Sequence, residues 1–128
     1  MKYLIIALML FPVIPAQAIG EHEKNLVESQ WCRKRYISGE WQVVQITFAK
    51  SRRYLTQVFD ESGDLILRRG GFWDIEDDIL SMRAHWDVSE ARLSFWNRDG
   101  YMNMNVQQLN PKRGNGKYRF IDCRALEE

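Results

Sequence analysis

Few side chains in this sequence are of types that perform acid–base chemistry, and their spacing does not form a catalytic set. His85 and Asp87 stand two residues apart, so in a strand they would share a face and the carboxylate could orient the imidazole. No nucleophile is implied at a fixed spacing from them. Zinc needs three or four suitably placed ligands, and the chain has only two histidines. We therefore predict no catalytic residue, no metal site and no cofactor, and we interpret residues 85–87 as an ordinary loop.

Acidic side chains gather in two places where a structural interpretation competes with a chemical one. Asp74, Glu76 and Asp78 alternate with apolar residues and should project together from the solvent face of a strand. Paired carboxylates can transfer protons or hold calcium. Hairpin ends are also commonly acidic for solubility, which is the interpretation we favour. Residues 60–64 resemble a calcium loop without the ligand at its far end, and we predict a tight turn there.

The two cysteines stand near opposite ends of the chain. Cys32 and Cys123 lack the close spacing of a redox-active pair. In an oxidising compartment, two such cysteines are expected to form one structural disulfide. Closing a loop of about 90 residues would stabilise the fold by roughly 4–5 kcal/mol in the chain-entropy model.

The first eighteen residues have the order of a secretory signal peptide. Met1-Lys2 is a short basic start, residues 3–15 are an apolar run, and Ala16-Gln17-Ala18 is an A-x-A cleavage site. The apolar run is too short to span a bilayer, and no cysteine follows it that could carry a lipid anchor. These features predict a signal peptide over 1–18 and one exported domain over 19–128, located in the periplasm or secreted and not membrane-anchored.

The overall charge argues against nucleic acid as a partner. Without Lys2, basic and acidic residues are equal in number at 17 each. Affinity for nucleic acid comes largely from clustered lysines and arginines that neutralise phosphates. The local basic clusters have acidic neighbours elsewhere in the sequence, and we interpret them as a solvated mixed surface.

From Gly39 onward the apolar residues recur with a period of two, which is typical of strands with one buried face. Turns are predicted at 60–63, at Asp77-Asp78 and at 97–100, a bend or bulge at Gly70-Gly71, a looser segment at 85–91 and a polar loop at 107–116. The sequence therefore predicts an all-β antiparallel meander of seven to eight strands that closes into a small barrel, because an open sheet would leave sticky edges. The expected strands are 41–48, 54–59, 65–69, 73–76, 79–84, 92–96, 101–106 and 117–123.

The segment before Gly39 has two interpretations. Acidic residues early in 21–35 and basic residues late favour a short N-terminal helix, since that order suits the helix dipole. The competing structure is a strand from Trp31 to Ile37 that turns at Ser38-Gly39. The sequence does not decide between them.

Short motifs in the strand region resemble those of bacterial lipocalin-like barrels. Gly39-x-Trp41 is similar to the G-x-W element at the start of the first lipocalin strand. The resemblance extends over about residues 39–123 and includes Phe59-Asp60-x-x-Gly63 and Gly71-x-Trp73-x-Ile75-x-x-Asp78-x-Leu80.

The resemblance implies a calycin-type barrel whose first-strand tryptophan, Trp41, packs at the closed end. Arg119 or Arg124 would lie over it, and a disulfide would tie a terminal segment to the barrel. The chain is shorter than a lipocalin and has no long helix after its last strand. Bulky inward aromatics can fill so small a barrel, so the motifs leave open whether it is hollow.

These observations favour a non-catalytic binding protein with one of two partners. A small amphipathic ligand in the barrel mouth would be lined by Trp41, Tyr54, Met82 and Met104. As a periplasmic protein-binding module (an envelope assembly factor, an inhibitor of a secreted hydrolase, or an immunity protein), the chain would instead meet its partner through an exposed patch of Phe72, Trp86 and Trp96 or the 107–116 loop. The oligomeric state is not encoded in any pattern we recognise.

Overall fold

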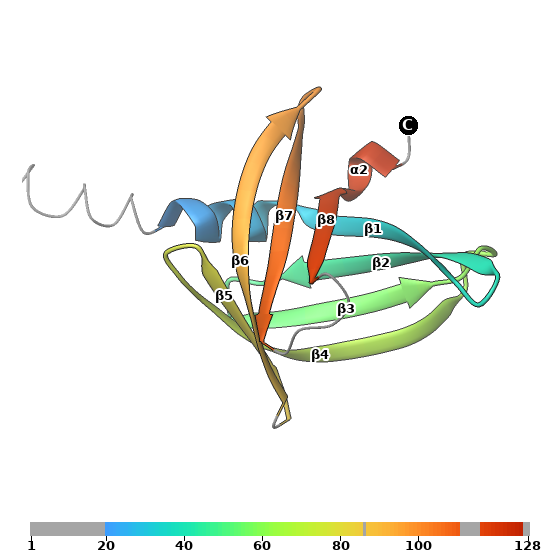
Figure 1. Ribbon diagram of the computed structural model, residues 1–128, viewed down its shortest axis with the longest axis horizontal. Coiled ribbons are helices and arrows are strands. Elements are labelled where there is room, and N and C mark those ends of the chain that lie inside the picture. The colour runs from blue at the N-terminus through green and yellow to red at the C-terminus, as the bar shows by residue number, and fades with distance from the viewer. Residues whose placement is uncertain (1–19, 86, 111–115, 127–128) are drawn as a thin grey trace, which may run out of the picture.

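Eight antiparallel strands close into one barrel in the computed structural model, which describes residues 20–85, 87–110 and 116–126 (Figure 1). Each strand pairs with its neighbour in the chain, and β1 pairs with β8 to close the barrel. The predicted all-β meander barrel with a short N-terminal helix is confirmed. The strands are β1 (Gln30–Ile37), β2 (Glu40–Phe48), β3 (Arg53–Phe59), β4 (Leu65–Glu76), β5 (Ile79–Ala84), β6 (Asp87–Arg98), β7 (Tyr101–Asn110) and β8 (Lys117–Asp122).

The segment with two interpretations contains both structures in succession. Residues 20–28 are helical, and β1 begins at Gln30 after a bend at Ser29. The helix predicted as far as Arg35 is therefore wrong beyond residue 28, while the competing strand is confirmed. Every residue of β1 pairs with β2, and this cross-strand pairing overrides the charge order that favoured a longer helix. The predicted turn is present, with Ser38 and Gly39 at φ 53° and 85°.

Two segments predicted as irregular extend strands instead. β6 begins at Asp87 and pairs with β5 from there, so the looser segment predicted over 85–91 is wrong for its second part. Residues 107–110 continue β7 rather than opening a loop. Residues 111–115 and Trp86 lie outside the described residues. The inward positions near the start of β6 are Asp87, Ser89 and Ala91, none of which is a large apolar residue, and this hides the alternation that reveals a strand.

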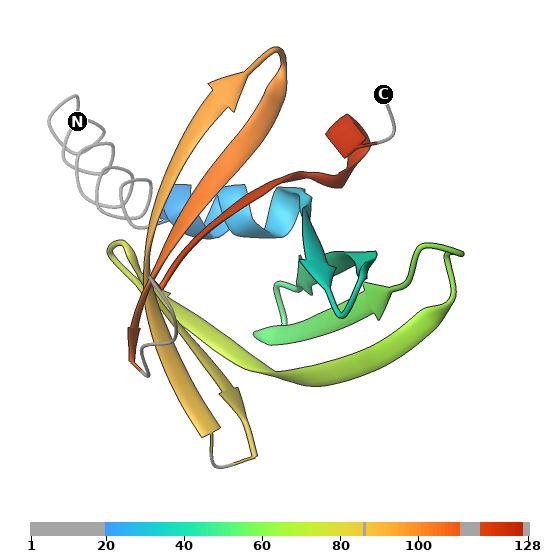
Figure 2. The same cartoon turned by 45° about the vertical axis from the view of Figure 1, so that its right-hand side comes forward.

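The Gly70-Gly71 pair lies inside a continuous strand and not at a bulge. The β3–β4 register runs through both glycines unbroken, and the irregularity falls between Val58 and Phe59 instead. Phe72 pairs with Arg53 on one side and with Arg83 on the other, so β4 passes here from one neighbour to the next. In Figure 2 β4 is a long curved ribbon through this region. A Cβ atom on Gly71 would lie 2.2 Å from the Arg83 carbonyl oxygen and 2.7 Å from the Tyr54 ring, so no side chain fits.

Replacing Gly71 by alanine should lower the free energy of unfolding by about 1–3 kcal/mol, the usual range for forcing an extra methyl group into a packed site. The obstructing atom is backbone, which cannot move aside without disturbing the β4–β5 pairing. Urea unfolding followed by tryptophan fluorescence measures the loss. Gly70→Ala is the matched control, because its Cβ meets nothing closer than 3.4 Å. Equal stability of the two variants would show that the close approach at Gly71 does not matter.

The most deeply buried side chains gather where the N-terminal helix meets the barrel. Leu26 from the helix and Trp31 from β1 are both 0% exposed, and the Trp31 indole N–H donates to the Leu26 carbonyl at 3.1 Å. Trp73 is 2% exposed, donates to the Ala49 carbonyl at 3.0 Å and meets the Phe48 ring edge-on. The helix and these aromatics therefore fill one end of the barrel. No helix within residues 20–85, 87–110 and 116–126 is long and apolar enough to cross a membrane.

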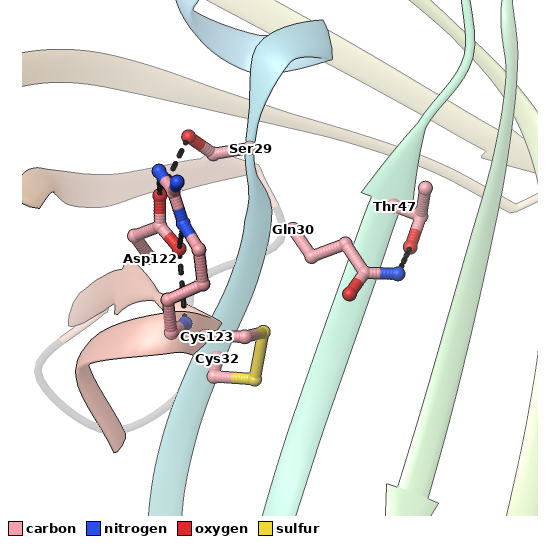
Figure 3. The surroundings of a disulfide bond; sticks show 7 residues. Ser29, Gln30, Cys32, Thr47, Asp122 and Cys123 are labelled. Atoms are coloured by element: carbon pink, nitrogen blue, oxygen red, sulfur yellow. Dashed lines mark hydrogen bonds and ion pairs between the residues drawn. A yellow bond between two sulfur atoms is a disulfide. The ribbon is translucent and has the colours of Figure 1, made fainter. Parts of the chain in front are cut away.

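The predicted disulfide between Cys32 and Cys123 is present and lies beside the closing seam of the barrel (Figure 3). Cys123 is the first residue of the short helix α2 (Cys123–Leu126) and is separated from Cys32 by 91 positions. The seam itself has only two β1–β8 pairs in register, Trp31 with Asp122 and Cys32 with Ile121. The covalent bond therefore reinforces the weakest pairing in the barrel.

Asp122 is a buried carboxylate next to this disulfide. It accepts hydrogen bonds from the Arg124 guanidinium at 2.7 and 3.1 Å, from the Arg124 backbone N–H at 3.0 Å and from the Ser29 hydroxyl at 3.2 Å. The side-chain hydrogen bonds from Arg124 are the main cause that lowers the pKa of Asp122 below its ordinary value of 3.8, against the opposing effect of burial.

Replacing Asp122 by asparagine should lower the free energy of unfolding at pH 7 by about 1.5–3 kcal/mol, the range for hydrogen bonds to charged groups. Because the folded pKa is the lower one, the wild-type carboxylate contributes stability above pH 3.8 and loses it as the pH falls through the folded value. The gap between wild type and variant should therefore narrow in acid, as measured by urea unfolding from pH 7 down to pH 2.5. Asp99→Asn, whose side chain is 91% exposed, is the control and should show no such gap. A difference in free energy of unfolding between wild type and Asp122→Asn that does not change with pH would contradict a stabilising role of the ionised Asp122 carboxylate.

Candidate functional site

The barrel holds a cavity that begins beside the buried tryptophans, since its lining residues Ile46 and Met82 pair directly with Trp31 and Trp73, and that extends to the end where β5 stops and β6 begins. Its volume is about 480 Å³, within the usual range of roughly 300–1,000 Å³ for small-molecule sites. All eight strands contribute to its wall. The lining residues are Arg33, Ile46, Tyr54, Arg69, Met82, Ala84, Asp87, Val88, Ser89, Val106, Gln108, Tyr118 and Phe120.

Strand register places most of these side chains inside the barrel. Ile46 alternates with the buried Val44 and Phe48 on β2, and it lies opposite Thr56 on β3. Thr56 in turn lies opposite Arg69, which puts the Arg69 side chain on the inner face of β4. Arg33 is two residues from the fully buried Trp31 on β1 and shares its face. The two arginines therefore lie on the inner face, Arg33 partly buried and Arg69 exposed, whereas their sequence neighbours Lys34 and Arg68 lie on the outer face.

The apolar part of the wall is continuous with the hydrophobic core. Ile46, Met82 and Val106 are partly buried and pack against the core, and Phe120 belongs to it. Ala84 and Ser89 are small, which leaves space at this end of the barrel where the other end is filled by tryptophan. The cavity thus offers apolar contact on several sides.

Arg33 is the most unusual group in the cavity. Its guanidinium carbon lies 4.8 Å from the centre of the Tyr118 ring and 5.7 Å from that of Phe120. Its Nε atom is buried and has no hydrogen-bond partner. Burial is the main cause that lowers the pKa of Arg33, with a smaller effect in the same direction from Arg35 and an opposing one from Tyr118. A cation held this way retains unused hydrogen-bond donors.

Tyr54 and Arg69 form the polar part of the opposite wall. Burial raises the pKa of the Tyr54 hydroxyl, and the positive charge of Arg69 partly offsets that effect. Asp87, at the exposed start of β6, is the one carboxylate among the lining residues. Within the described part of the chain, neither Arg33 nor Arg69 forms an ion pair. The cavity is therefore lined by two cations and one anion.

The four predicted pocket residues fall in three different places. Tyr54 and Met82 line the cavity. Met104 is 1% exposed and packs in the core instead of facing open space. Trp41 is 52% exposed on the outer face, where its ring meets Tyr36 edge-on, so placing it in the pocket was wrong. The even-numbered residues of β2 point inward, beginning with the buried Gln42, and Trp41 must therefore point outward.

The predicted partner-surface residues do not form one patch in the described structure. Phe72 is 55% exposed on the outer face of β4, with the Arg53 guanidinium 5.3 Å from its ring centre. Phe72 lies opposite Arg83 on β5, and Arg83 lies opposite Val88 on β6. Trp96 is eight residues further along β6 than Val88 and is therefore far from Phe72 along the strand direction. Eight strand residues span roughly 26 Å. The third predicted residue, Trp86, lies outside the described residues, as do residues 111–115 of the predicted loop.

The two acidic segments of the sequence lie on the outer surface of β4 and in the turn between β3 and β4. Asp74 and Glu76 are exposed on the outer face of β4, as expected, while Asp78 lies in the next turn and pairs with Arg92 at 3.4 Å. The Asp60 carboxylate accepts the backbone N–H groups of Ser62 and Asp64 at 2.9 Å each, which confirms the predicted tight turn. In residues 20–85, 87–110 and 116–126, no three His, Cys, Asp or Glu side chains are grouped to hold a metal ion.

Sequence reasoning missed Arg33 and Arg69 as cavity residues, although a signal for each is present. Each arginine lies on the same strand face as a buried neighbour: Trp31 for Arg33 and Trp73 for Arg69. A charged residue at period two from a core residue either faces the interior or marks the end of the buried stretch, and the sequence alone does not distinguish these cases.

Comparison with protein-family models, curated proteins and solved structures found no match to this chain. The lipocalin-like resemblance of the short motifs thus stays a prediction. One of its implications is wrong: the G-x-W tryptophan, Trp41, is not at the filled end of the barrel, which contains Trp31 and Trp73 instead. Nor does Arg124 lie over it, since its guanidinium stacks on Tyr101 at 5.8 Å.

Proposed function

We propose that this chain is an exported, non-catalytic, lipocalin-like binding protein that holds a small amphipathic molecule in the open end of its barrel. The observation that carries the proposal is the interior cavity of about 480 Å³ whose wall combines core-packed apolar side chains with a few polar ones. This combination of apolar contact and convergent polar groups is typical of small-molecule sites. The cavity is not enclosed, so a ligand can enter it from solvent.

Export is proposed from two features. Residues 1–18 have the signal-peptide pattern, and the Cys32–Cys123 disulfide fits an oxidising compartment. We therefore propose the periplasm, or the medium beyond it, as the location where the ligand is met.

The binding proposal is tested by titrating the protein with 1-aminoanthracene, a neutral apolar dye that fluoresces when it leaves water. Wild type should bind it, and Met82→Trp, which fills the cavity, should weaken binding at least tenfold. Arg83→Trp is the matched control, because Arg83 is the next residue on β5 and is exposed on the outer face. Absence of dye uptake by folded wild-type protein, or equal uptake by the Met82→Trp variant, would overturn the proposal.

A second candidate function, a periplasmic protein-binding module, is favoured by a separate observation. Large apolar side chains are exposed at the tips of the β1–β2 and β3–β4 hairpins. The two tips are joined by a hydrogen bond at 2.6 Å, which the Trp41 backbone N–H donates to the Glu61 carboxylate. Exposed clusters of this kind mark interaction surfaces. The exposed side chains are Tyr36, Ile37, Trp41, Leu65, Ile66 and Leu67. This candidate predicts stoichiometric capture of one periplasmic protein by wild type and none by Trp41→Ser; equal recovery with both would count against it.

A further inference from the structure

We infer that the ligand in the barrel is an amphipathic anion, an apolar chain with a carboxylate or phosphate headgroup, and that the Arg33 guanidinium binds the headgroup. This inference rests on the proposed function and specifies the chemical class of its ligand. The Arg33 guanidinium lies inside the cavity, carries a buried Nε donor without a partner, and has no carboxylate paired with it in the described part of the chain.

The surroundings of Arg33 explain why an anion is preferred there over a neutral group. The cation lies over the Tyr118 and Phe120 rings, which exclude water from one side. An unpaired, partly desolvated cation is unfavourable in the empty protein, and a bound oxyanion removes that penalty while accepting hydrogen bonds from the guanidinium. A neutral ligand of the same shape would leave the penalty in place.

The rest of the cavity supports an apolar chain attached to that headgroup. Ile46, Met82 and Val106 offer apolar contact around the same space. Arg69 adds a second positive charge on β4, and the single lining carboxylate, Asp87, lies exposed at the start of β6. The lining therefore combines apolar side chains with an excess of positive charge, of which Arg33 is the partly buried part and Arg69 the exposed part, and this combination matches an anion with a hydrocarbon tail.

The inference is tested with a fluorescent acid and its neutral counterpart, 11-(dansylamino)undecanoic acid and the methyl ester of the same compound. Wild type should bind the acid at least tenfold more tightly than the ester, since hydrogen bonds to charged groups correspond to about ten- to hundredfold in affinity. Arg33→Gln should remove most of this preference and leave the ester affinity unchanged. Arg69→Gln should reduce it by a smaller factor. Lys34→Gln, which removes a charge from the outer face of β1 next to Arg33, should leave both affinities as in wild type.

The outcomes separate this inference from the proposed function. If neither acid nor ester binds to folded wild type, the proposed function fails. If both bind equally, or if Arg33→Gln changes nothing, the inference fails while the proposed function stands. Ester binding also reports whether the Arg33→Gln variant has kept its barrel. If this variant does not fold, the comparison of Arg69→Gln with Lys34→Gln decides: a smaller preference for the acid in Arg69→Gln supports the inference, and an equal preference overturns it. Competition by dodecanoate or by dodecyl phosphate then identifies the headgroup, and competition by neither would overturn the inference.

Discussion

Replacing Cys32 and Cys123 together by alanine should lower the free energy of unfolding by about 4–5 kcal/mol, the chain-entropy value for a loop of this length. The bond closes a loop of 91 positions, which joins the first strand to the helix after the last one. It also lies beside the β1–β8 seam, where only two residue pairs are in register. Without the disulfide, the unfolded chain gains conformational entropy and the folded seam loses its covalent support. Both effects lower the free energy of unfolding.

The loss is measured by urea unfolding of the double variant and of wild type under oxidising conditions. Wild type treated with reductant should approach the stability of the variant, and reductant should leave the variant itself unchanged. The single variants are poor controls because each leaves a free thiol. A loss below about 1 kcal/mol in the double variant would contradict the role given to the bond, because it would fall within the range of an ordinary single substitution.

Trp31→Ala should lower the free energy of unfolding by about 3–5 kcal/mol, the range for removing a large aromatic side chain from a core. Trp31 is 0% exposed and packs within the main hydrophobic cluster, with its ring centre 5.8 Å from that of Phe95. Its indole N–H also donates to the Leu26 carbonyl at 3.1 Å. The substitution therefore opens a void and also removes one of the contacts between the N-terminal helix and the barrel.

Trp41→Ala is the matched control for this prediction. Trp41 lies ten residues further along and is 52% exposed on the outer face, so its truncation removes much less buried area than that of Trp31 and opens no void in the core. Surface substitutions of this kind usually change stability by about 0.5 kcal/mol or less. Hydrogen exchange adds a second readout, because the amides of residues 20–28 should lose protection in Trp31→Ala and keep it in Trp41→Ala. Comparable losses in the two variants would show that the core does not lie where the structure puts it.

The strands could be predicted from the sequence wherever large apolar residues alternate with polar ones. β5 is predicted with its observed bounds, since Ile79, Leu80 and Met82 follow a clear turn signal at Asp77-Asp78 and precede a segment without alternation. β6 is predicted only from Arg92 onward, because its inward positions before that are Asp87, Ser89 and Ala91, none of which is a large apolar residue. Small side chains face the inside of the barrel at the point where the cavity lies. The residues that leave room for a ligand are therefore the same ones that hide the strand from a pattern search.

The cavity wall could be predicted only in part for a related reason. Tyr54 and Met82 were found because an aromatic and a methionine on strands are ordinary candidates for an apolar pocket. The neighbouring Lys34 and Arg35 make Arg33 resemble part of a basic surface cluster, whereas its position two residues after Trp31 places it on the inner face. Trp41 was placed inside on the strength of a three-residue motif, whereas the register set by Gln42 and Val44 turns it outward. For both Arg33 and Trp41, the alternation of inward and outward positions along the strand predicts the observed side of the sheet.

The two ends of this barrel differ in a way that connects stability with function. The end next to the N-terminal helix is filled by Trp31, Trp73 and Phe48, each of which is at most 2% exposed. The other end contains a partly buried arginine and an empty volume, both of which are unfavourable for the unliganded fold. Features that oppose folding are commonly retained where a ligand later satisfies them.

The most direct test of this account is the NMR signal of the Arg33 Nε–H group, assigned by its loss in Arg33→Gln, during titration with dodecanoate. We predict that this signal moves progressively and saturates, together with the backbone amides of Val106 and Tyr118 in the cavity wall. Shifts confined to the outer face, around Trp41 and Phe72, with the Arg33 signal unmoved at saturating ligand, would contradict the account.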